Sequence, residues 1–244
     1  MTPLAKCGPV LAGVLAPLLP TGVAVVDTFY DSNELGLFPE EEALLVKAVQ
    51  KRRQEFSTGR RCARAALAAH GLPPAPILPG PRGAPLWPDG MVGSITHCAG
   101  YRAAAVARAT DIAALGIDAE PTEPLRDPGV LALLTDAEER AALAGLKLRQ
   151  PETPWEKLLF SAKESVYKAW FPLTGEWLGF HDAHVSLAPD GTFTATLLVP
   201  GPSVGGIPLT GFDGRWLVTG GLAVTAVTLS ATAVRDRTAD GVPR

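Results

Sequence analysis

A chain of 244 residues with 47% hydrophobic and 19% charged residues can form one large domain or two small ones, and it is too apolar to be disordered. The net charge of −3 argues against nucleic-acid binding along the whole surface, although a local basic patch can still bind phosphate groups. The three cysteines are widely spaced and form no CxxC pair, so they suggest neither a disulfide framework nor a zinc site and favour a reducing cytoplasm.

The first predicted element is a strand that begins within the end of an apolar segment at 9–26, and Pro17 and Pro20 interrupt this segment. We expect a loop there, not a signal peptide or a membrane-spanning helix. A strand rich in β-branched residues follows at 22–30. A helix is expected to begin at Pro39 and to continue, with a break near Gly59, to a C-terminal cap at Gly71. After a Pro- and Gly-rich connector, three strands are predicted, at 91–97, 101–109 and 113–120.

The second half combines helices with hairpins. Thr135 and Glu138 have the spacing of a capping box for a helix that ends near 148, and Pro154 opens the next helix. Turn sequences at 189–191 and 219–221 predict two hairpins. Residues 231–244 are polar and aperiodic, so we expect a flexible tail. This order of elements predicts an α+β fold with antiparallel strands.

Two acids stand close together in the sequence GIDAEP, at Asp118 and Glu120. In a strand, alternate side chains share a face, so both carboxylates would emerge on one side with Cα atoms roughly 6.5 Å apart. Paired anions favour a positive partner, and Mg²⁺ suits oxygen ligands and substrate phosphates. A solvent-facing pair at a strand end is the structural alternative.

The helical segment LLFSAKESVYKAW at 158–170 carries Lys163, Glu164 and Lys168. Glu164 and Lys168 are four residues apart and share one face, whereas Lys163 lies about 100° around the helix. An ordinary intrahelical ion pair, worth about 0.3 to 0.5 kcal/mol, would also explain the spacing. The apolar side chains on the opposite side predict that one face packs on the core and the other is free for chemistry.

A basic segment at 51–64, KRRQEFSTGRRCAR, holds six basic residues in fourteen. On a helix its arginines form a stripe whose guanidinium groups suit phosphate oxygens. The stripe consists of Arg53, Arg60 and Arg64, flanked by Arg52 and Arg61. The alternative is a solvated helix face with Glu55 as its counterion.

A lone histidine, His97, follows Ser94 and Thr96 in the sequence GSITHC. Such a histidine is often a structural hydrogen-bonding group, so the sequence leaves that alternative open beside a role in a site. A nucleophilic pair with Cys98 is disfavoured because neighbouring strand residues point to opposite faces.

Together, these four segments resemble the phosphopantetheinyl transferases of the larger, monomeric Sfp type, and most of all their actinobacterial branch. The paired GxDxE and KExxxK motifs carry the resemblance, which spans about residues 37–228. It implies an α+β fold of two pseudo-twofold-related halves, 1–117 and 118–230, each with an antiparallel sheet and packed helices. The active site would lie in the cleft between them.

The resemblance also implies an activity. The enzyme would transfer the 4′-phosphopantetheine arm of coenzyme A to a serine of an apo acyl or peptidyl carrier protein and release adenosine 3′,5′-bisphosphate. Its partners would be coenzyme A and the carrier domains of fatty-acid, polyketide and nonribosomal-peptide synthases, with no nucleic acid or membrane. The implied state is a cytoplasmic monomer that uses Mg²⁺, or Mn²⁺ in its place.

The resemblance assigns a metal and catalytic set to the two acidic motifs. Asp118, Glu120 and Glu164 would hold the metal, together with the backbone carbonyl of Ala119. Glu164 would act as the base for the serine proton, directly or through a metal-bound water, and Lys168 would stabilise the leaving phosphate. Asp118 belongs to this catalytic set as well.

A second set would bind coenzyme A. Arg52 and Arg60 would contact the 3′-phosphate, Thr96 and His97 the pyrophosphate and nucleotide. Lys163 and Lys168 would neutralise charge around the departing group. The loop LPGPRG at 78–83 would run past the adenine with Arg82 as its charged residue, because Pro79 stands where relatives often carry lysine. Tyr167 and Trp177 would line the pantetheine channel.

Two other classes of protein share these features. A Mg²⁺-dependent pyrophosphatase or phosphodiesterase would use most of the same residues with water as the nucleophile. A noncatalytic module that binds coenzyme A or a carrier protein would need the binding residues without turnover, and the three acids argue against it.

Overall fold

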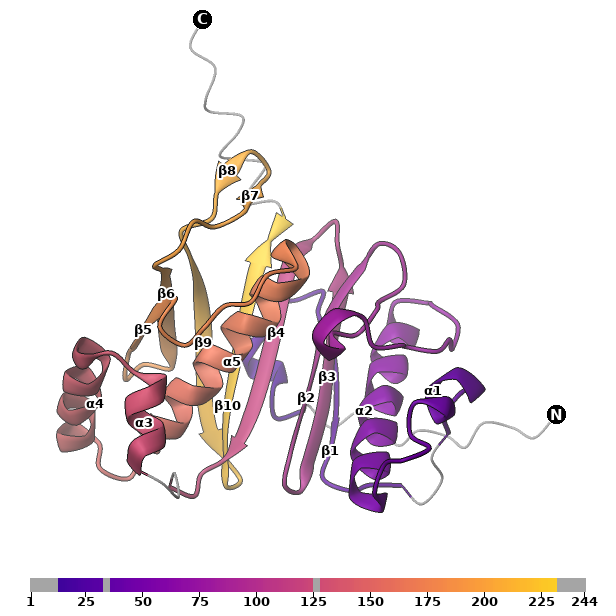
Figure 1. Ribbon diagram of the computed structural model, residues 1–244, viewed down its shortest axis with the longest axis horizontal. Helices are drawn as coiled ribbons and strands as arrows, with labels where there is room; N and C mark the ends of the chain where they lie inside the picture. Colours follow the sequence, from indigo (N-terminus) through magenta and orange to yellow (C-terminus); the bar gives the residue numbers. More distant parts are fainter. Residues whose placement is uncertain (1–12, 33–35, 125–127, 232–244) are drawn as a thin grey trace, which may run out of the picture.

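Two antiparallel sheets lie side by side in the computed structural model, which describes residues 13–32, 36–124 and 128–231 (Figure 1). The first sheet has the order β1-β3-β2, with β1 at Ala24–Thr28, β2 at Met91–Cys98 and β3 at Tyr101–Arg108. The second has the order β4-β10-β9-β6-β5, with β4 at Ile112–Pro121, β5 at Ala183–Leu187, β6 at Thr192–Leu197, β9 at Gly211–Thr219 and β10 at Leu222–Ser230. A small ribbon joins β7, Ser203–Val204, to β8, Ile207–Pro208. The predicted α+β class with antiparallel sheets is confirmed.

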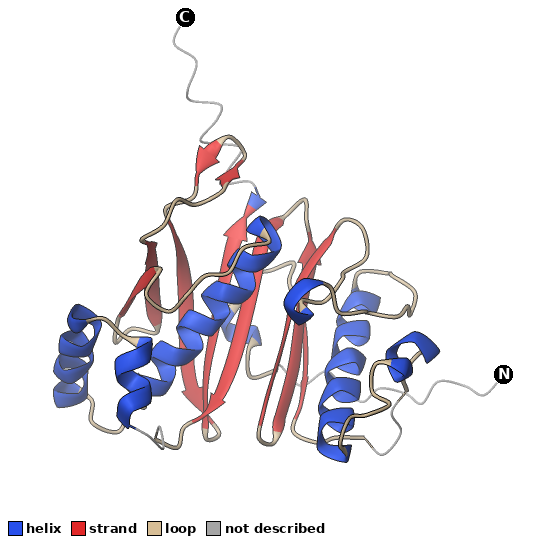
Figure 2. Cartoon of the chain, in the orientation of Figure 1, coloured by secondary structure: helices blue, strands red, loops and turns tan. Residues whose placement is uncertain are grey.

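Each sheet is packed against one long helix (Figure 2). Helix α2, Gln50–Ala69, packs on β1 and β3, and α5, Trp155–Thr174, packs on β4 and β10. The shorter helices are α1 at Pro39–Ala43, α3 at Pro128–Leu134 and α4 at Ala137–Arg149, with 3-10 turns at Ala16–Leu18 and Pro81–Gly83. A cluster of buried hydrophobic residues that includes Tyr101, Ile117 and Val224 joins the two sheets to each other.

The seam between the sheets lies where strands β2 and β4 face each other. These edge strands do not form a backbone ladder. Ser94 Oγ accepts a hydrogen bond from the Ile117 amide at 3.1 Å, and Thr96 Oγ1 accepts one from the Ala119 amide at 3.2 Å. The two hydroxyl groups satisfy the buried amides that an edge strand would otherwise leave unpaired. They therefore fix the position of β4 and its acids against the first half of the chain.

Helix α5 lies directly on the backbone of β4 at Gly116. A Cβ atom at this position would lie 1.9 Å from the carbonyl oxygen of Ser165, so no larger residue fits without moving the helix. This close approach places Lys168 of α5 within hydrogen-bonding distance of Asp118. The opposite side of the helix, including Leu158, Val166 and Trp170, is buried in the core, as its pattern predicts.

Local patterns predicted most elements. The structure corrects the helix expected from Pro39 to Gly71 and the capping box of α4. The helix that begins at Pro39 ends at Ala43, and a separate helix runs without a break through Gly59, against which Ile95 packs. The capping box of α4 uses Asp136 and Glu139, not Thr135 and Glu138. Thr135 instead donates to the Leu131 carbonyl at the end of α3. Both predicted hairpins are confirmed, as β5–β6 and β9–β10.

The predicted boundary between 117 and 118 falls inside β4. This strand pairs with β10 from Ile112 to Pro121, so the connection between the two sheets lies at 109–111. Of the predicted tail, residues 232–244 lie outside the described residues. Within the described ranges, the helices are too short or too polar to cross a bilayer.

Candidate active site

A cavity of about 520 Å³ lies between the two halves of the chain. Its walls come from α2, β2 and the connector at 79–87 on one side and from α5 on the other. The volume is that of a site for a cofactor-sized ligand. Seven of the predicted site residues line it: Arg52, Arg60, Arg82, His97, Glu164, Tyr167 and Lys168.

The first wall of the cavity is basic. Arg60 is 6% exposed, its Nε donates to the Ile77 carbonyl at 2.8 Å, and its guanidinium lies 4.3 Å from the centroid of the Phe56 ring. Burial lowers the pKa of Arg60 to about 10, so it still carries its charge at neutral pH. Arg52 is exposed, and its Nη1 lies 3.4 Å from His97 Nε2. Positive charge inside a concave site favours a ligand with several phosphates.

Partial desolvation of the imidazole lowers the pKa of His97, and the positive charges of Arg52 and Lys168 lower it further, against the opposing negative charge of Glu55. The imidazole is therefore neutral at pH 7, and a neutral ring can both donate and accept hydrogen bonds. His97 thus adds a hydrogen-bonding group to the basic wall without adding charge.

The arginines of α2 have different roles, because some line the cavity and others bond to groups within the fold. Arg64 forms an ion pair with buried Glu41 at 2.9 Å, and Arg53 donates to the Leu45 carbonyl at 2.7 Å. Neither lines the cavity, and Arg61 is exposed outside it. Of the stripe and its two flanking arginines, only Arg60 and Arg52 line the cavity.

The acids of β4 lie at the seam. Asp118 Oδ1 accepts from Thr96 Oγ1 at 3.2 Å and from Lys168 Nζ at 2.6 Å, whereas its buried Oδ2 has no hydrogen-bond partner. Glu120 Oε2 lies 3.5 Å from Lys157 Nζ. Burial raises the pKa of both Glu120 and Glu164, and the negative charge of Asp118 raises each further. The three carboxylates therefore share one electrostatic environment.

The carboxylates of Asp118, Glu120 and Glu164 have the chemistry needed to bind a divalent cation. A buried carboxylate oxygen without a partner, beside two acids whose anions are destabilised, favours an added positive charge with a preference for oxygen ligands. The ligand oxygens of Asp118, Glu120 and Glu164 do not all lie within 4.8 Å of one another. In the described ranges, only the group of Asp136, Glu139 and His184 meets that distance. Lys168 and Lys157 supply the nearby positive charge in this arrangement.

The backbone of Ala119 belongs to the same edge. Its amide donates across the seam to Thr96, and in a strand the amide and carbonyl of one residue point the same way. Its carbonyl thus lies on the edge of β4 that faces β2, which is compatible with the predicted ligand. Thr96 itself is buried and does not line the cavity, and its hydroxyl group bonds to β4. Its predicted contact with the nucleotide stays a prediction.

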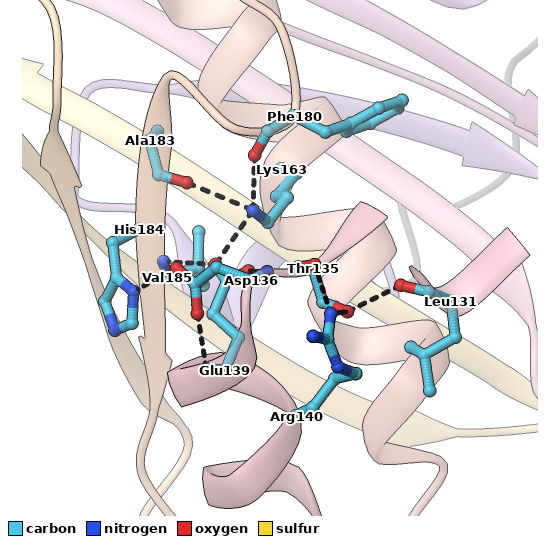
Figure 3. Close-up of polar contacts among 10 residues, drawn as sticks. All are labelled: Leu131, Thr135, Asp136, Glu139, Arg140, Lys163, Phe180, Ala183, His184 and Val185. Carbon is cyan, nitrogen blue, oxygen red and sulfur yellow. Dashed lines mark hydrogen bonds and ion pairs between the residues drawn. The ribbon is translucent and has the colours of Figure 1, made fainter. Parts of the chain in front are cut away.

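The two lysines of the KExxxK motif point in different directions. Lys168 donates to Asp118 and to the Ile117 carbonyl, at 2.6 and 3.2 Å, so it bonds across to β4 in place of the intrahelical pair with Glu164. Lys163 is buried, and its ammonium bonds to Glu139, away from the large cavity (Figure 3). The Lys163 ammonium therefore lies away from the cavity in which the phosphates are predicted to bind. Lys163 and Glu164 differ by about 100° on the helix, which is enough to separate their environments.

Two aromatic side chains lie beside the cavity, and one of them, Tyr167, lines it. The rings of Tyr167 and Trp177 lie 4.9 Å apart between centroids, and the Arg82 guanidinium carbon is 5.2 Å from the Trp177 ring. Trp177, which is 58% exposed, lines a smaller neighbouring cavity and not the large one. The 79–85 connector and the loop after α5 thus contact each other through Arg82 and Trp177.

Sequence reasoning missed two parts of the site. Lys157, the partner of Glu120, lies seven residues before Glu164, which is the spacing of two helical turns on one face. The apolar lining of the cavity comes from residues scattered over the chain, and no local pattern indicates them: Leu45, Phe56, Trp87 and Phe171.

Two family models match the chain. The model of the 4′-phosphopantetheinyl transferase N-terminal domain covers residues 40–107, and that of the 4′-phosphopantetheinyl transferase superfamily covers residues 114–206. The chain belongs to the 4′-phosphopantetheinyl transferases.

Three relatives from actinobacteria cover nearly the whole chain. The 4′-phosphopantetheinyl transferase Svp of Streptomyces mobaraensis is 56% identical over 93% of this chain and 94% of its own. The 4′-phosphopantetheinyl transferase PptT of Mycobacterium tuberculosis is 46% identical over 91% of this chain and 99% of its own. The 4′-phosphopantetheinyl transferase Npt of Nocardia iowensis is 46% identical over 88% of this chain and 99% of its own.

Proposed function

We propose that this enzyme transfers the 4′-phosphopantetheine arm of coenzyme A to a serine hydroxyl of an apo acyl or peptidyl carrier protein. The observation that carries the proposal is a single cavity with arginines on one wall and Glu164 and Lys168 on the other. Coenzyme A has a 3′-phosphate and a pyrophosphate, which would engage these two walls. The carriers would belong to fatty-acid, polyketide or nonribosomal-peptide synthases, and the enzyme would act as a cytoplasmic monomer.

The basic wall would bind the nucleotide end of the substrate. Arg52 and Arg60 would contact the 3′-phosphate, and neutral His97 would hydrogen-bond to a phosphate or the ribose. Arg82 would lie along the adenine, while Tyr167 and Trp177 would border the pantetheine arm. The apolar lining would exclude water from the pyrophosphate, which strengthens each charged contact.

Mg²⁺, or Mn²⁺ in its place, would be held by Asp118, Glu120 and Glu164 with the Ala119 carbonyl. When bound, such an ion neutralises charge on a pyrophosphate and polarises it for attack. The orphaned Asp118 Oδ2 supports this assignment. Lys168, placed by Asp118, would stabilise the oxygen that departs.

The reaction needs no nucleophile from the enzyme. The serine oxygen forms a bond to the phosphorus that carries pantetheine, and the bond from that phosphorus to the bridging oxygen breaks. Adenosine 3′,5′-bisphosphate leaves with the bridging oxygen. The serine proton goes to the Glu164 carboxylate, whose raised pKa makes it a better base than an ordinary glutamate.

The test uses coenzyme A and an apo carrier protein followed by mass spectrometry. The proposal expects the carrier to gain the mass of one phosphopantetheine group and adenosine 3′,5′-bisphosphate to appear in equal amount. Coenzyme A cleavage that does not need the carrier would instead indicate a pyrophosphatase or phosphodiesterase. Binding of coenzyme A without any turnover would indicate a noncatalytic module.

A further inference from the structure

A buried ion pair lies beside the cleft, and the proposed chemistry does not use it (Figure 3). Lys163 Nζ lies 2.8 Å from Glu139 Oε1, and the two side chains are 3% and 0% exposed. The ammonium also donates to the carbonyls of Phe180 at 2.5 Å and Ala183 at 3.0 Å. All three of its donors therefore have acceptors within the protein.

Glu139 connects three elements through one carboxylate. Its Oε2 accepts from the Asp136 amide at 3.0 Å and completes the capping box of α4. Its Oε1 accepts from the Val185 amide of β5 at 2.8 Å as well as from Lys163 of α5. Helices α4 and α5 and strand β5 thus meet at this buried group.

The same cluster has the spacing of a metal site, because ligand atoms of Asp136, Glu139 and His184 lie within 4.8 Å of one another. Its ligand atoms are already bonded, however. His184 Nδ1 lies 2.8 Å from Asp136 Oδ2, and the Lys163 ammonium supplies the positive charge at Glu139. The cluster is therefore a hydrogen-bonded network with its own cation.

The network reaches the proposed active site through Lys163. This residue directly precedes Glu164 on α5, and the carbonyl that it binds at Phe180 belongs to the loop that carries Trp177. A small cavity of about 60 Å³ lies between helix and loop, next to the large one. Its lining includes Lys163, Glu164, Tyr167, Trp177 and Phe180. Lys163 thus ties the Trp177 loop to the turn of helix that bears the proposed base.

A buried ion pair is a weak means of stabilising a fold, because desolvation of both charges offsets most of their attraction. Its directional bonds do restrict how the joined elements can lie. We infer that Lys163 and Glu139 are positioning residues, which hold Glu164 and the Trp177 loop in the geometry that the transfer reaction needs. Lys163 does this without contact with the phosphates of coenzyme A. The inference rests on the proposed function.

The test removes both charges together, in the double variant Lys163→Met/Glu139→Gln, so that no unpaired charge is buried. We expect its melting temperature to stay near that of the parent. The kcat for carrier modification should fall about 10-fold to 100-fold, because small misplacements of reacting groups are costly, while KM for coenzyme A changes by less than about twofold. Glu138→Gln, an exposed neighbour on α4, is the matched control and should leave kcat unchanged.

Other outcomes would overturn the inference. Parent-like kcat in a folded double variant would show that the pair serves folding alone. A severalfold rise in KM for coenzyme A with unchanged kcat would make Lys163 a substrate ligand. If the double variant does not fold, the single variant Glu139→Gln tests the inference, because Glu139 lines neither cavity. A lower kcat at unchanged KM for coenzyme A would support a positioning role. A parent-like kcat would refute it. A parent that modifies no carrier would refute the proposed function as well, whereas an active parent confines any failure to this inference.

Discussion

The ammonium of Lys168 lies 2.6 Å from Asp118 Oδ1, so a cation from α5 meets an anion from β4 where the two sheets adjoin. Thr96, from the first sheet, bonds to the same carboxylate oxygen. Both sheets and the helix therefore fix this group, and its second oxygen stays without a partner. The free oxygen leaves Asp118 able to bind a further positive group at this junction.

Loss of the Glu164 carboxylate should slow catalysis more than it weakens binding. Glu164→Gln keeps the shape of the side chain, but the amide cannot take up the serine proton. We therefore expect kcat to fall about 100-fold to 10,000-fold, with KM for coenzyme A little changed. Steady-state kinetics with an apo carrier measure both quantities. Equal losses in kcat and in coenzyme A affinity would contradict its role as the base.

Loss of the Arg52 guanidinium should have the opposite effect. Arg52→Ala removes a phosphate contact made before and during the reaction, so KM for coenzyme A should rise roughly 10-fold to 100-fold with kcat nearly constant. Arg61→Ala is the matched control, because Arg61 is an exposed arginine of the same helix outside the cavity. Similar effects of the two variants would refute a specific phosphate site at Arg52.

Mg²⁺ should stabilise the folded protein through the three acids. At a concentration of about 100 times Kd, a ligand that binds only the folded state adds about 2.7 kcal/mol, which raises the Tm of a chain of this size by roughly 5 to 10 °C. Chelation with EDTA should reverse the shift. Asp118→Asn should abolish it, and an equal shift in that variant would place the ion elsewhere.

The buried thiols should be unreactive in the native state. Burial raises the pKa of Cys62 to about 11 and that of Cys98 to about 12, so neither forms thiolate near neutral pH. In a Cys7→Ser variant, a thiol reagent should react only after unfolding. Because the unfolded chain loses these protons near pH 9, the free energy of unfolding should fall as pH rises from about 9 to 12. Fast labelling of the native variant at pH 7 would contradict this.

The contact at Gly116 should tolerate no side chain. Gly116→Ala places a methyl group 1.9 Å from the Ser165 carbonyl oxygen, so we expect a loss of about 1 to 3 kcal/mol in the free energy of unfolding, or failure to fold. Gly145→Ala on α4 has open space and should be neutral or stabilising by about 0.5 to 1 kcal/mol. Denaturant titration of both variants measures the difference, and equal stabilities would refute the contact.

Some site residues were predictable because their signals are local. Asp118 and Glu120 alternate on one strand, and Glu164 and Lys168 share one helix face, so each motif was visible in a few consecutive residues. The capping box shows the limit of such signals. Thr135–Glu138 and Asp136–Glu139 both have the correct spacing, and the second is used because Glu139 also finds Lys163 and the Val185 amide in the core.

By itself, the sequence determined the order and type of most elements and the residues available for the chemistry, because strand alternation, helical periodicity and turn residues act over short distances. Only the tertiary structure decided which of these residues meet. The contact between Gly116 and Ser165 sets how α5 lies on β4, and that orientation sends Lys168 to Asp118 but Lys163 to Glu139. The rotation of a helix about its axis depends on what it packs against, and that surface comes from distant parts of the chain.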